Sequence, residues 1–146
     1  MIEIKVEDKK VAQLLKRLEK KGADLTPVMR VIAGIMHDAV EENFEKEGQP
    51  KWTPLAKSTK KQRARKGHWP GKILQVSPAG LAQSISQKSD SRSARVGSNK
   101  IYAAIQQLGG KAGKDHAATI PARPFLKLPK SHLDTIKKAI LSYLTK

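Results

Sequence analysis

The chain has 146 residues, with 29 Lys and Arg against 13 Asp and Glu, so its formal net charge at neutral pH is +16. This length suits one domain rather than two, and the absence of cysteine excludes disulfides and thiolate metal sites. No apolar run has the length of a signal peptide or approaches the roughly 20 residues of a membrane span. We therefore expect a single soluble domain spanning residues 1–146, and the lack of cysteine fits an intracellular one.

The first 45 residues predict a short strand and two helices. Residues 2–6 alternate apolar and charged side chains, which is typical of a half-buried strand. Asp8 can cap a first helix that ends at Gly22. Asp24 or Thr26 can cap a second helix, which has the strongest apolar period of the chain. Its apolar positions are Val28, Val31, Ile32, Ile35, Met36, Ala39, Val40 and Phe44.

An acidic face is expected on the other side of this second helix, formed by Asp38, Glu41, Glu42 and Glu45. These residues lie toward the C-terminal end, where the helix dipole disfavours negative charge. The cost suggests that the acidic face has a use, such as pairing with a basic surface of the same chain or of a neighbour.

Positive charge is concentrated in the middle of the chain. Residues 50–130 hold 17 Lys and Arg but two Asp and Glu, and no acidic residue lies between Glu47 and Asp90. Residues 47–72 are also interrupted by glycines and prolines, which predicts a long, flexible basic loop or arm inserted in the domain, with at most one helical stretch near residues 53–66. Such a segment meets a polyanion or an acidic protein surface, or it stays mobile and hydrated. The residues expected to make these contacts are Trp52, Lys57, Lys60, Lys61, Arg63, Arg65, Lys66 and Trp69.

The two tryptophans at the ends of this basic segment have alternative interpretations. Trp52 is either a cap over the end of the second helix or an interface residue, since large aromatic side chains are common in both settings. Nucleic-acid binders combine basic residues with aromatic stacking, but six aromatic residues in the whole chain are few for a stacking platform. Phe44, Phe125 and Tyr143 lie in apolar patterns and are expected in the core.

The C-terminal half predicts a small sheet and a last helix. Strands are expected at residues 73–76, 84–88 and 94–97, followed by a short helix over residues 102–108 that Gly109 and Gly110 end. Residues 111–118 predict a flexible link. Two prolines hold residues 119–126 extended, on a sheet edge or as a strap across the core. A final helix follows a capping box formed by Ser131 and Asp134.

These elements predict an α+β fold. A small, mainly antiparallel sheet is expected to pack against the two N-terminal helices and the C-terminal helix, with the basic loop or arm outside this core.

No set of residues predicts catalysis. The four histidines, His37, His68, His116 and His132, lie in separate segments, and no pair has the spacing of metal ligands. No serine lies in a nucleophile elbow, and no phosphate loop occurs. Carboxylates for acid–base or two-metal chemistry would have to come from the N-terminal helices, where they follow a solvated face. We therefore expect no metal, no cofactor and no enzymatic activity, and a nuclease has no candidate site.

Several motifs follow one another along the chain. They are Trp52-Thr53-Pro54-Leu55, Val96-Gly97-Ser98-Asn99, Tyr102-Ala103, Gln107-Leu108-Gly109-Gly110 and Ile120-Pro121-Ala122-Arg123-Pro124-Phe125-Leu126. In this order they resemble the phage virion morphogenesis family, which includes Mu-like G proteins and P2-like tail completion proteins, over roughly residues 2–144. The residues that carry the resemblance most specifically are Tyr102, Gly109, Gly110, Pro121, Arg123, Pro124 and Phe125.

The resemblance implies a non-enzymatic phage or prophage protein that acts in tail completion and head–tail joining. It implies a homo-oligomeric ring, with six copies as one candidate order, that contacts tail tube, terminator or head–neck proteins. Such a protein is made in the bacterial host cytoplasm and can remain in the virion neck or tail.

Two contacts for the basic arm stay open. The arm can dock on the acidic face of an adjacent subunit's second helix and become ordered only on assembly, or it can line a channel for DNA. The alternative function is a basic nucleic-acid-binding protein that contacts DNA through residues 51–72, with an affinity that falls steeply with salt.

Overall fold

A computed structural model describes residues 2–3, 8–75 and 80–145, and the fold is α+β as the sequence predicts. The helices are α1 (Lys9–Lys20), α2 (Thr26–Glu45), α3 (Lys57–Arg65), α4 (Ala103–Leu108) and α5 (Lys130–Leu144). The strands are β1 (Ile2–Glu3), β2 (Ser86–Ser89), β3 (Ala94–Ser98), β4 (Gly110–Ala112) and β5 (Ala118–Ile120). Two short 3-10 turns, η1 (Ala82–Ser84) and η2 (Lys114–His116), complete the described elements.

Both sheets are antiparallel. The larger has the strand order β1-β3-β2, and in its register Val96 of β3 lies opposite Gln87 of β2. The smaller is the β4–β5 hairpin, in which Gly110 pairs with Ile120. The prediction of a small antiparallel sheet is thus confirmed, although it is divided into two.

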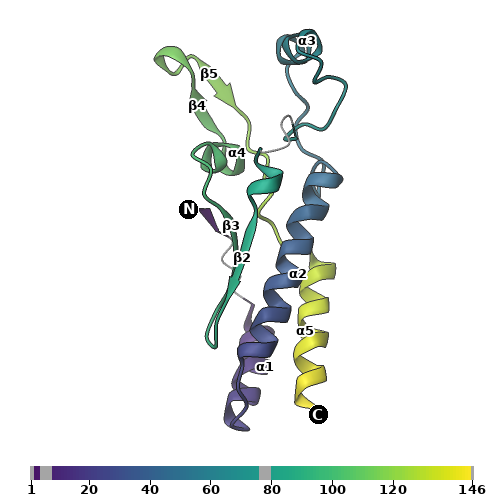
Figure 1. Ribbon diagram of the computed structural model, residues 1–146, viewed down its shortest axis with the longest axis vertical. Helices are drawn as coiled ribbons and strands as arrows, with labels where there is room; N and C mark the ends of the chain where they lie inside the picture. Colours follow the sequence, from purple (N-terminus) through teal and green to yellow (C-terminus); the bar gives the residue numbers. More distant parts are fainter. Residues whose placement is uncertain (1, 4–7, 76–79, 146) are drawn as a thin grey trace.

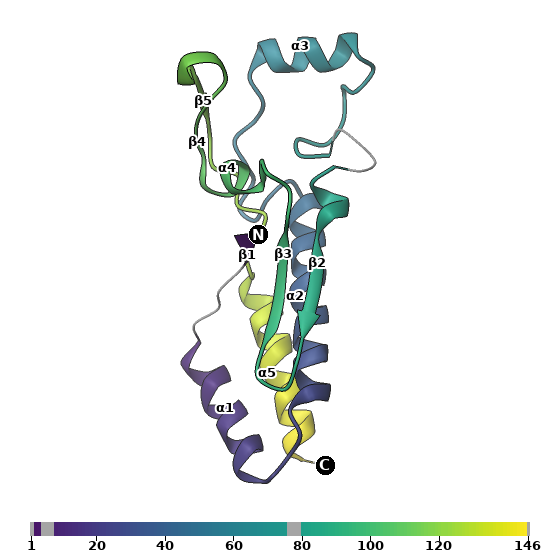
Figure 2. The same cartoon turned by 60° about the vertical axis from the view of Figure 1, so that its left-hand side comes forward.

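The core forms around α2, which lies between the three-stranded sheet and α5 (Figure 1). Its buried face includes Val28, Ile32, Val40 and Phe44, because these residues recur at spacings of three and four. The molecule is long and narrow: α3 and the β4–β5 hairpin lie at one end, and the C-terminus and the loop between α1 and α2 lie at the other (Figure 2). The basic helix α3 therefore lies at the end of the molecule opposite to the C-terminus and the loop between α1 and α2.

The N-terminal elements largely follow the sequence prediction. Asp8 caps α1 as expected, since its carboxylate accepts a 2.9 Å hydrogen bond from the Val11 amide. At α2 neither predicted N-cap is right: Leu25 occupies that position, and Asp24, one residue further out, accepts a 3.0 Å bond from the Thr26 amide. β1 spans two residues, and residues 4–6 of the predicted strand lie outside the described part of the chain.

Three local predictions in the second half are wrong. Residues 73 and 74 form a turn and residue 75 is irregular, where the sequence predicts a strand over residues 73–76; residue 76 lies outside the described part of the chain. The Ile73 carbonyl accepts a 2.8 Å bond from Arg63 instead of one from a strand amide. Residues 111–118 are not a flexible link but most of the β4–β5 hairpin, whose exposed, small and polar residues lack the apolar alternation by which strands are recognised. Ser131 lies inside the first turn of α5 and forms no capping box, since Pro129 is the N-cap.

The basic segment is less free than the sequence suggests. Its single helix, α3, falls within the predicted stretch, and irregular residues flank it on both sides. Trp52 and Leu55 before α3 and Ile73 after it are buried in the core cluster. The segment therefore leaves and rejoins the core at fixed points, and a long flexible loop over residues 47–72 is not confirmed.

Among the described residues, no helix combines the length and the apolar content that crossing a bilayer would require.

Candidate functional site

α3 has one face toward the molecule and one toward solvent. Lys57, Lys61 and Arg65 recur every four residues, so they lie on the same side of the helix, and all three are exposed. We call these three residues the basic stripe. Like charges at this spacing destabilise a helix, so an anionic partner would relieve a cost that the isolated chain bears.

The inward face of α3 holds the helix in place. Arg63 donates hydrogen bonds from one guanidinium nitrogen to the carbonyl oxygens of Lys72, at 3.3 Å, and Ile73, at 2.8 Å. Partial burial lowers the pKa of Arg63 from its ordinary value. The ammonium of Lys60 lies 5.5 Å from the centre of the Trp69 ring, which is a cation–π contact. Two of the eight predicted contact residues, Lys60 and Arg63, therefore orient α3.

The tryptophans pack on the protein itself. Trp52 is buried, packs edge to face on Phe44 with 5.9 Å between ring centres, and donates from its indole nitrogen to the Pro124 carbonyl at 3.1 Å. Of its two interpretations, this favours the cap over the end of α2. Trp69 is half-buried under Lys60. Neither ring is open for base stacking on both faces.

The segment that carries the most specific family motif is the predicted strap. Arg123 is 5% exposed, and its guanidinium donates to the carbonyl oxygens of Thr53, at 2.9 Å, and Pro54, at 3.2 Å. Burial, and next the charge of Arg63, lower the pKa of Arg123 from its ordinary value. The strap thus binds Thr53 and Pro54, which lie shortly before α3. The family motif therefore helps to hold the basic helix in position.

Neighbouring motif residues fix the strap. Phe125 is fully buried against Phe44, with 5.3 Å between ring centres. Gly109 has a φ of +74°, and a Cβ there would lie 2.8 Å from the Ala122 amide nitrogen, so no other residue fits without a shift. Gly110 is the first residue of β4. β5 takes up residues 119 and 120 of the predicted strap, so the strap itself begins at Pro121.

α4 also holds the strap and exposes apolar surface. Gln107 exchanges two hydrogen bonds with the backbone of Leu126, accepting from its amide at 2.8 Å and donating to its carbonyl at 3.2 Å. Around the same helix, Ile101 is 99% exposed, Leu108 72% and Tyr102 44%. The sequence predicts this helix but gives no signal for the exposure, because an isoleucine beside a turn is equally expected in a core.

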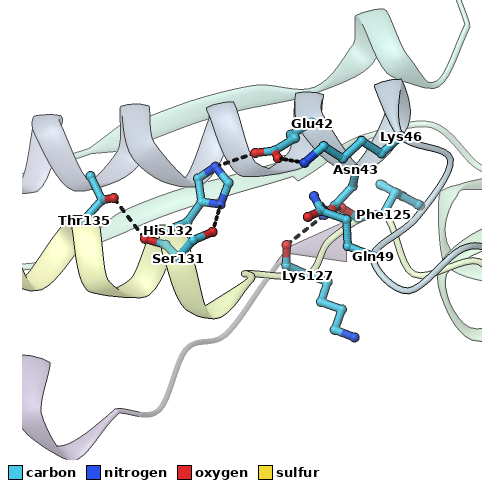
Figure 3. A network of polar contacts seen from close by, with 9 residues as sticks. All are labelled: Glu42, Asn43, Lys46, Gln49, Phe125, Lys127, Ser131, His132 and Thr135. Atoms are coloured by element: carbon cyan, nitrogen blue, oxygen red, sulfur yellow. Dashed lines mark hydrogen bonds and ion pairs between the residues drawn. The ribbon is translucent and has the colours of Figure 1, made fainter.

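A polar network that sequence reasoning missed joins α2 to the strap and to α5 (Figure 3). Asn43, fully buried, donates at 2.8 Å to the carbonyl oxygens of both Phe125 and Lys127. Glu42, the residue directly before Asn43, pairs with Lys46 and, at 2.9 Å, with Nε2 of His132. Partners separated by more than 80 residues leave no local pattern, so only the fold reveals them.

The acidic face of α2 is narrower than predicted, because Glu42 points to α5. Asp38, Glu41 and Glu45 remain exposed on one side of the helix, and we call them the acidic stripe. Their contacts within the chain are long: Glu41 lies 3.8 Å from His37, and Glu45 lies 3.7 Å from Lys72. The fold therefore presents one exposed row of cations and one exposed row of carboxylates on different helices.

Across residues 2–3, 8–75 and 80–145, no three His, Asp or Glu side chains gather where they could hold a metal ion.

The chain belongs to the phage virion morphogenesis family, whose model matches residues 6–145. It is 40% identical to "Mu-like prophage FluMu G protein 2" of Haemophilus influenzae, over 94% of this chain and 92% of that protein, and 36% identical to "Mu-like prophage FluMu G protein 1" of the same organism, over 97% and 92%. It is 33% identical to "Putative capsid assembly protein G" of Escherichia phage Mu, over 80% of each. No solved structure matches the chain at a significant level. The protein is thus a phage virion assembly protein, and the family resemblance of its motifs is confirmed.

Proposed function

We propose that this protein is a non-enzymatic structural subunit that completes the phage tail and joins it to the head. It assembles into a ring in the cytoplasm of the bacterial host and stays in the virion neck or tail. Its partners are further copies of itself together with tail tube, terminator or head–neck proteins. Residues 47–72 act as the extension of a single domain through which a subunit reaches its neighbour.

The observation that carries this proposal is that hydrogen bonds connect the family motif to the segment that contains the basic helix α3. Arg123 of the strap bonds to the carbonyl oxygens of Thr53 and Pro54, and Arg63 of α3 bonds to those of Lys72 and Ile73. Both ends of the extension are therefore fixed to the core. A helix held in this way offers a cationic surface without first paying the entropy of ordering a loop.

The exposed apolar side chains around α4 support the same role. Large apolar residues on a surface mark contact sites when they cluster beside a functional element. Ile101 lies just before α4, the helix that holds the strap, and Leu108 is its last residue, so we assign both to contact with another virion protein rather than with DNA.

A complementation experiment tests this function. A phage or prophage that lacks the gene for this chain receives the wild-type gene, or a variant in which residues 57–66 are replaced by a Gly/Ser linker of equal length. We expect the variant to be folded, by circular dichroism, and to yield heads and tails that fail to join in electron micrographs. If the variant supports a wild-type yield of infectious particles, the proposal is wrong.

The alternative function, non-specific DNA binding through residues 51–72, is favoured by the exposure of the basic stripe alone. Three phosphate contacts would weaken duplex binding by roughly 40-fold between 50 and 200 mM salt. A filter-binding titration over this range distinguishes the two, because a protein–protein surface predicts no measurable duplex affinity at 200 mM. Buried Trp52 and covered Trp69 count against this alternative, since neither can form a stacking platform.

A further inference from the structure

We propose that the basic stripe of one copy, Lys57, Lys61 and Arg65, packs along the acidic stripe of a second copy, Asp38, Glu41 and Glu45. This inference rests on the proposed ring assembly and names the partner surface of α3. The acidic occupant is a helix of the same chain, so each subunit would carry both halves of the contact.

The two stripes match in length and spacing. With a rise of 1.5 Å per residue, the basic stripe extends over about 12 Å and the acidic stripe over about 10 Å. Each places three charges on one side of a helix at steps of about one turn. Side by side, the helices can therefore form three ion pairs in register.

The helix dipoles favour the same pairing. The acidic stripe occupies the C-terminal half of α2, where the dipole disfavours carboxylates and the last turn holds no basic residue. The basic stripe begins at the first residue of α3, where the dipole disfavours cations and the first turn holds no acidic residue. Glu45 and Lys57 therefore each bear an electrostatic cost in the isolated chain, and one contact would relieve both. Arg65, in the last turn of α3, lies where the dipole favours a cation.

The contact has to be made between copies. α3 lies beyond the C-terminal end of α2 and crosses its direction instead of running along it, as Figures 1 and 2 both show. Within the described part of the chain, Lys72 lies 3.7 Å from Glu45, and the Glu45 side chain is still 76% exposed. The acidic stripe is thus largely open to a neighbour.

A contact between two different surfaces has a known consequence for assembly. Such heterologous contacts repeat from subunit to subunit and close into a ring when the rotation between neighbours allows it. The pairing of α3 with α2 would therefore build a ring without any two-fold symmetric interface.

Zero-length crosslinking of the wild-type protein tests the pairing. Equal amounts of unlabelled and ¹⁵N-labelled protein are mixed at low salt and treated with a carbodiimide, which joins amines to carboxylates in contact, and intermolecular peptides are identified by mass spectrometry. We expect links from Lys57 and Lys61 to Asp38, Glu41 or Glu45. Links to these carboxylates from the exposed lysines of α1, Lys10 and Lys20, should be about tenfold rarer, because three exposed ion pairs together shift an association by roughly that factor. Equal yields from α1 and α3, or no intermolecular links from α3, would overturn the pairing.

A charge exchange provides the second measurement. The variant Lys57→Glu/Lys61→Glu/Arg65→Glu and the variant Asp38→Lys/Glu41→Lys/Glu45→Lys should each lose intermolecular links between α2 and α3. Their mixture should regain them, because the reversed α3 of the first then faces the reversed α2 of the second. Loss without recovery on mixing would contradict the pairing.

The two proposals can fail separately. If crosslinks form but the variant with the residue 57–66 linker still yields infectious particles, the proposed function fails and the pairing stands. If particle yield collapses but no α2–α3 link forms, the function stands and the pairing fails.

Discussion

The buried side chain of Asn43 on α2 donates a 2.8 Å hydrogen bond to the carbonyl oxygen of Phe125 on the strap, and it bonds equally to Lys127. An extended segment normally receives its hydrogen bonds from the backbone amides of a neighbouring strand. Here the single side-chain amide of Asn43 supplies them. The strap is thereby tied to the central helix at the position where Phe125 enters the core.

Replacing Asn43 by alanine should lower the free energy of unfolding by about 2–4 kcal/mol, because one buried and one partly buried carbonyl group lose their donor and a small cavity remains. Urea denaturation measures this loss. The control is Gln49→Ala, which removes a half-buried side chain that donates to the side-chain oxygen Oδ1 of Asn43 at 3.1 Å, and it should cost under about 1 kcal/mol. Similar losses in both variants would contradict the role given to Asn43.

Arg123→Lys should weaken the attachment of residues 53–54, which precede α3, to the strap. Lysine keeps the charge but cannot donate to the Thr53 and Pro54 carbonyl oxygens from two nitrogens in a fixed plane. We expect a loss of about 1–3 kcal/mol in stability and faster trypsin cleavage within residues 57–66. Arg95→Lys, at an exposed position of β3, is the matched control and should change neither property. Unchanged cleavage in the Arg123 variant would show that the strap does not hold the segment.

Gly109→Ala and Gly67→Ala separate backbone strain from a close contact. Both glycines have a positive φ, of +74° and +77°, but a Cβ at Gly67 meets no atom of the described residues within 4 Å, whereas one at Gly109 lies 2.8 Å from the Ala122 amide nitrogen. The Gly67 variant should cost about 1 kcal/mol, and the Gly109 variant at least about 2 kcal/mol more, since the strap has to move. Thermal unfolding of the two variants provides the comparison, and equal melting temperatures would refute the close contact.

Acidification should weaken the connection between α2 and α5. The hydrogen bond from Lys46 lowers the pKa of Glu42, with a smaller contribution from the charge of His132. A carboxyl group whose pKa is lower in the folded state stabilises the fold above its unfolded pKa, and that stabilisation is lost as the pH falls through the folded pKa. The difference in melting temperature between wild type and Glu42→Gln should therefore be present near pH 7 and vanish as the pH falls below about 4. A difference for Glu42→Gln that stays constant with pH would contradict this account.

The sequence predicts those parts of the fold that depend on local spacing. α1, α2, α4 and α5 follow from apolar periods, the cap at Asp8 from its position before a helix, and β2 and β3 approximately from short polar and apolar runs. The β4–β5 hairpin was not predictable in this way, because Lys111, Ala112, Ala118 and Thr119 alternate in no recognisable pattern and their pairing stabilises them instead.

The candidate site shows the same division. The basic stripe follows from a four-residue period that is visible in the sequence, yet the sequence cannot show that Arg63 and Lys60 point inward or that Trp52 is buried. Those facts depend on Pro124, Arg123 and Ile73, which lie up to 72 residues from their partners. Long-range contacts to backbone carbonyl groups leave no pattern in the sequence. The structure is therefore needed to distinguish the charged residues that hold α3 in place from those that are exposed to a partner.

The central claim is that the exposed cations of α3 serve assembly, and the yield of infectious particles tests it most directly. The variant Lys57→Glu/Lys61→Glu/Arg65→Glu is compared, in a host that lacks the wild-type gene, with Lys10→Glu/Arg17→Glu/Lys20→Glu on α1, which changes the net charge equally at exposed positions. We predict a loss of at least about 100-fold for the α3 variant and a near wild-type yield for the α1 variant, since three like charges at an interface each cost well over 1 kcal/mol. Equal yields from the two variants would contradict the account.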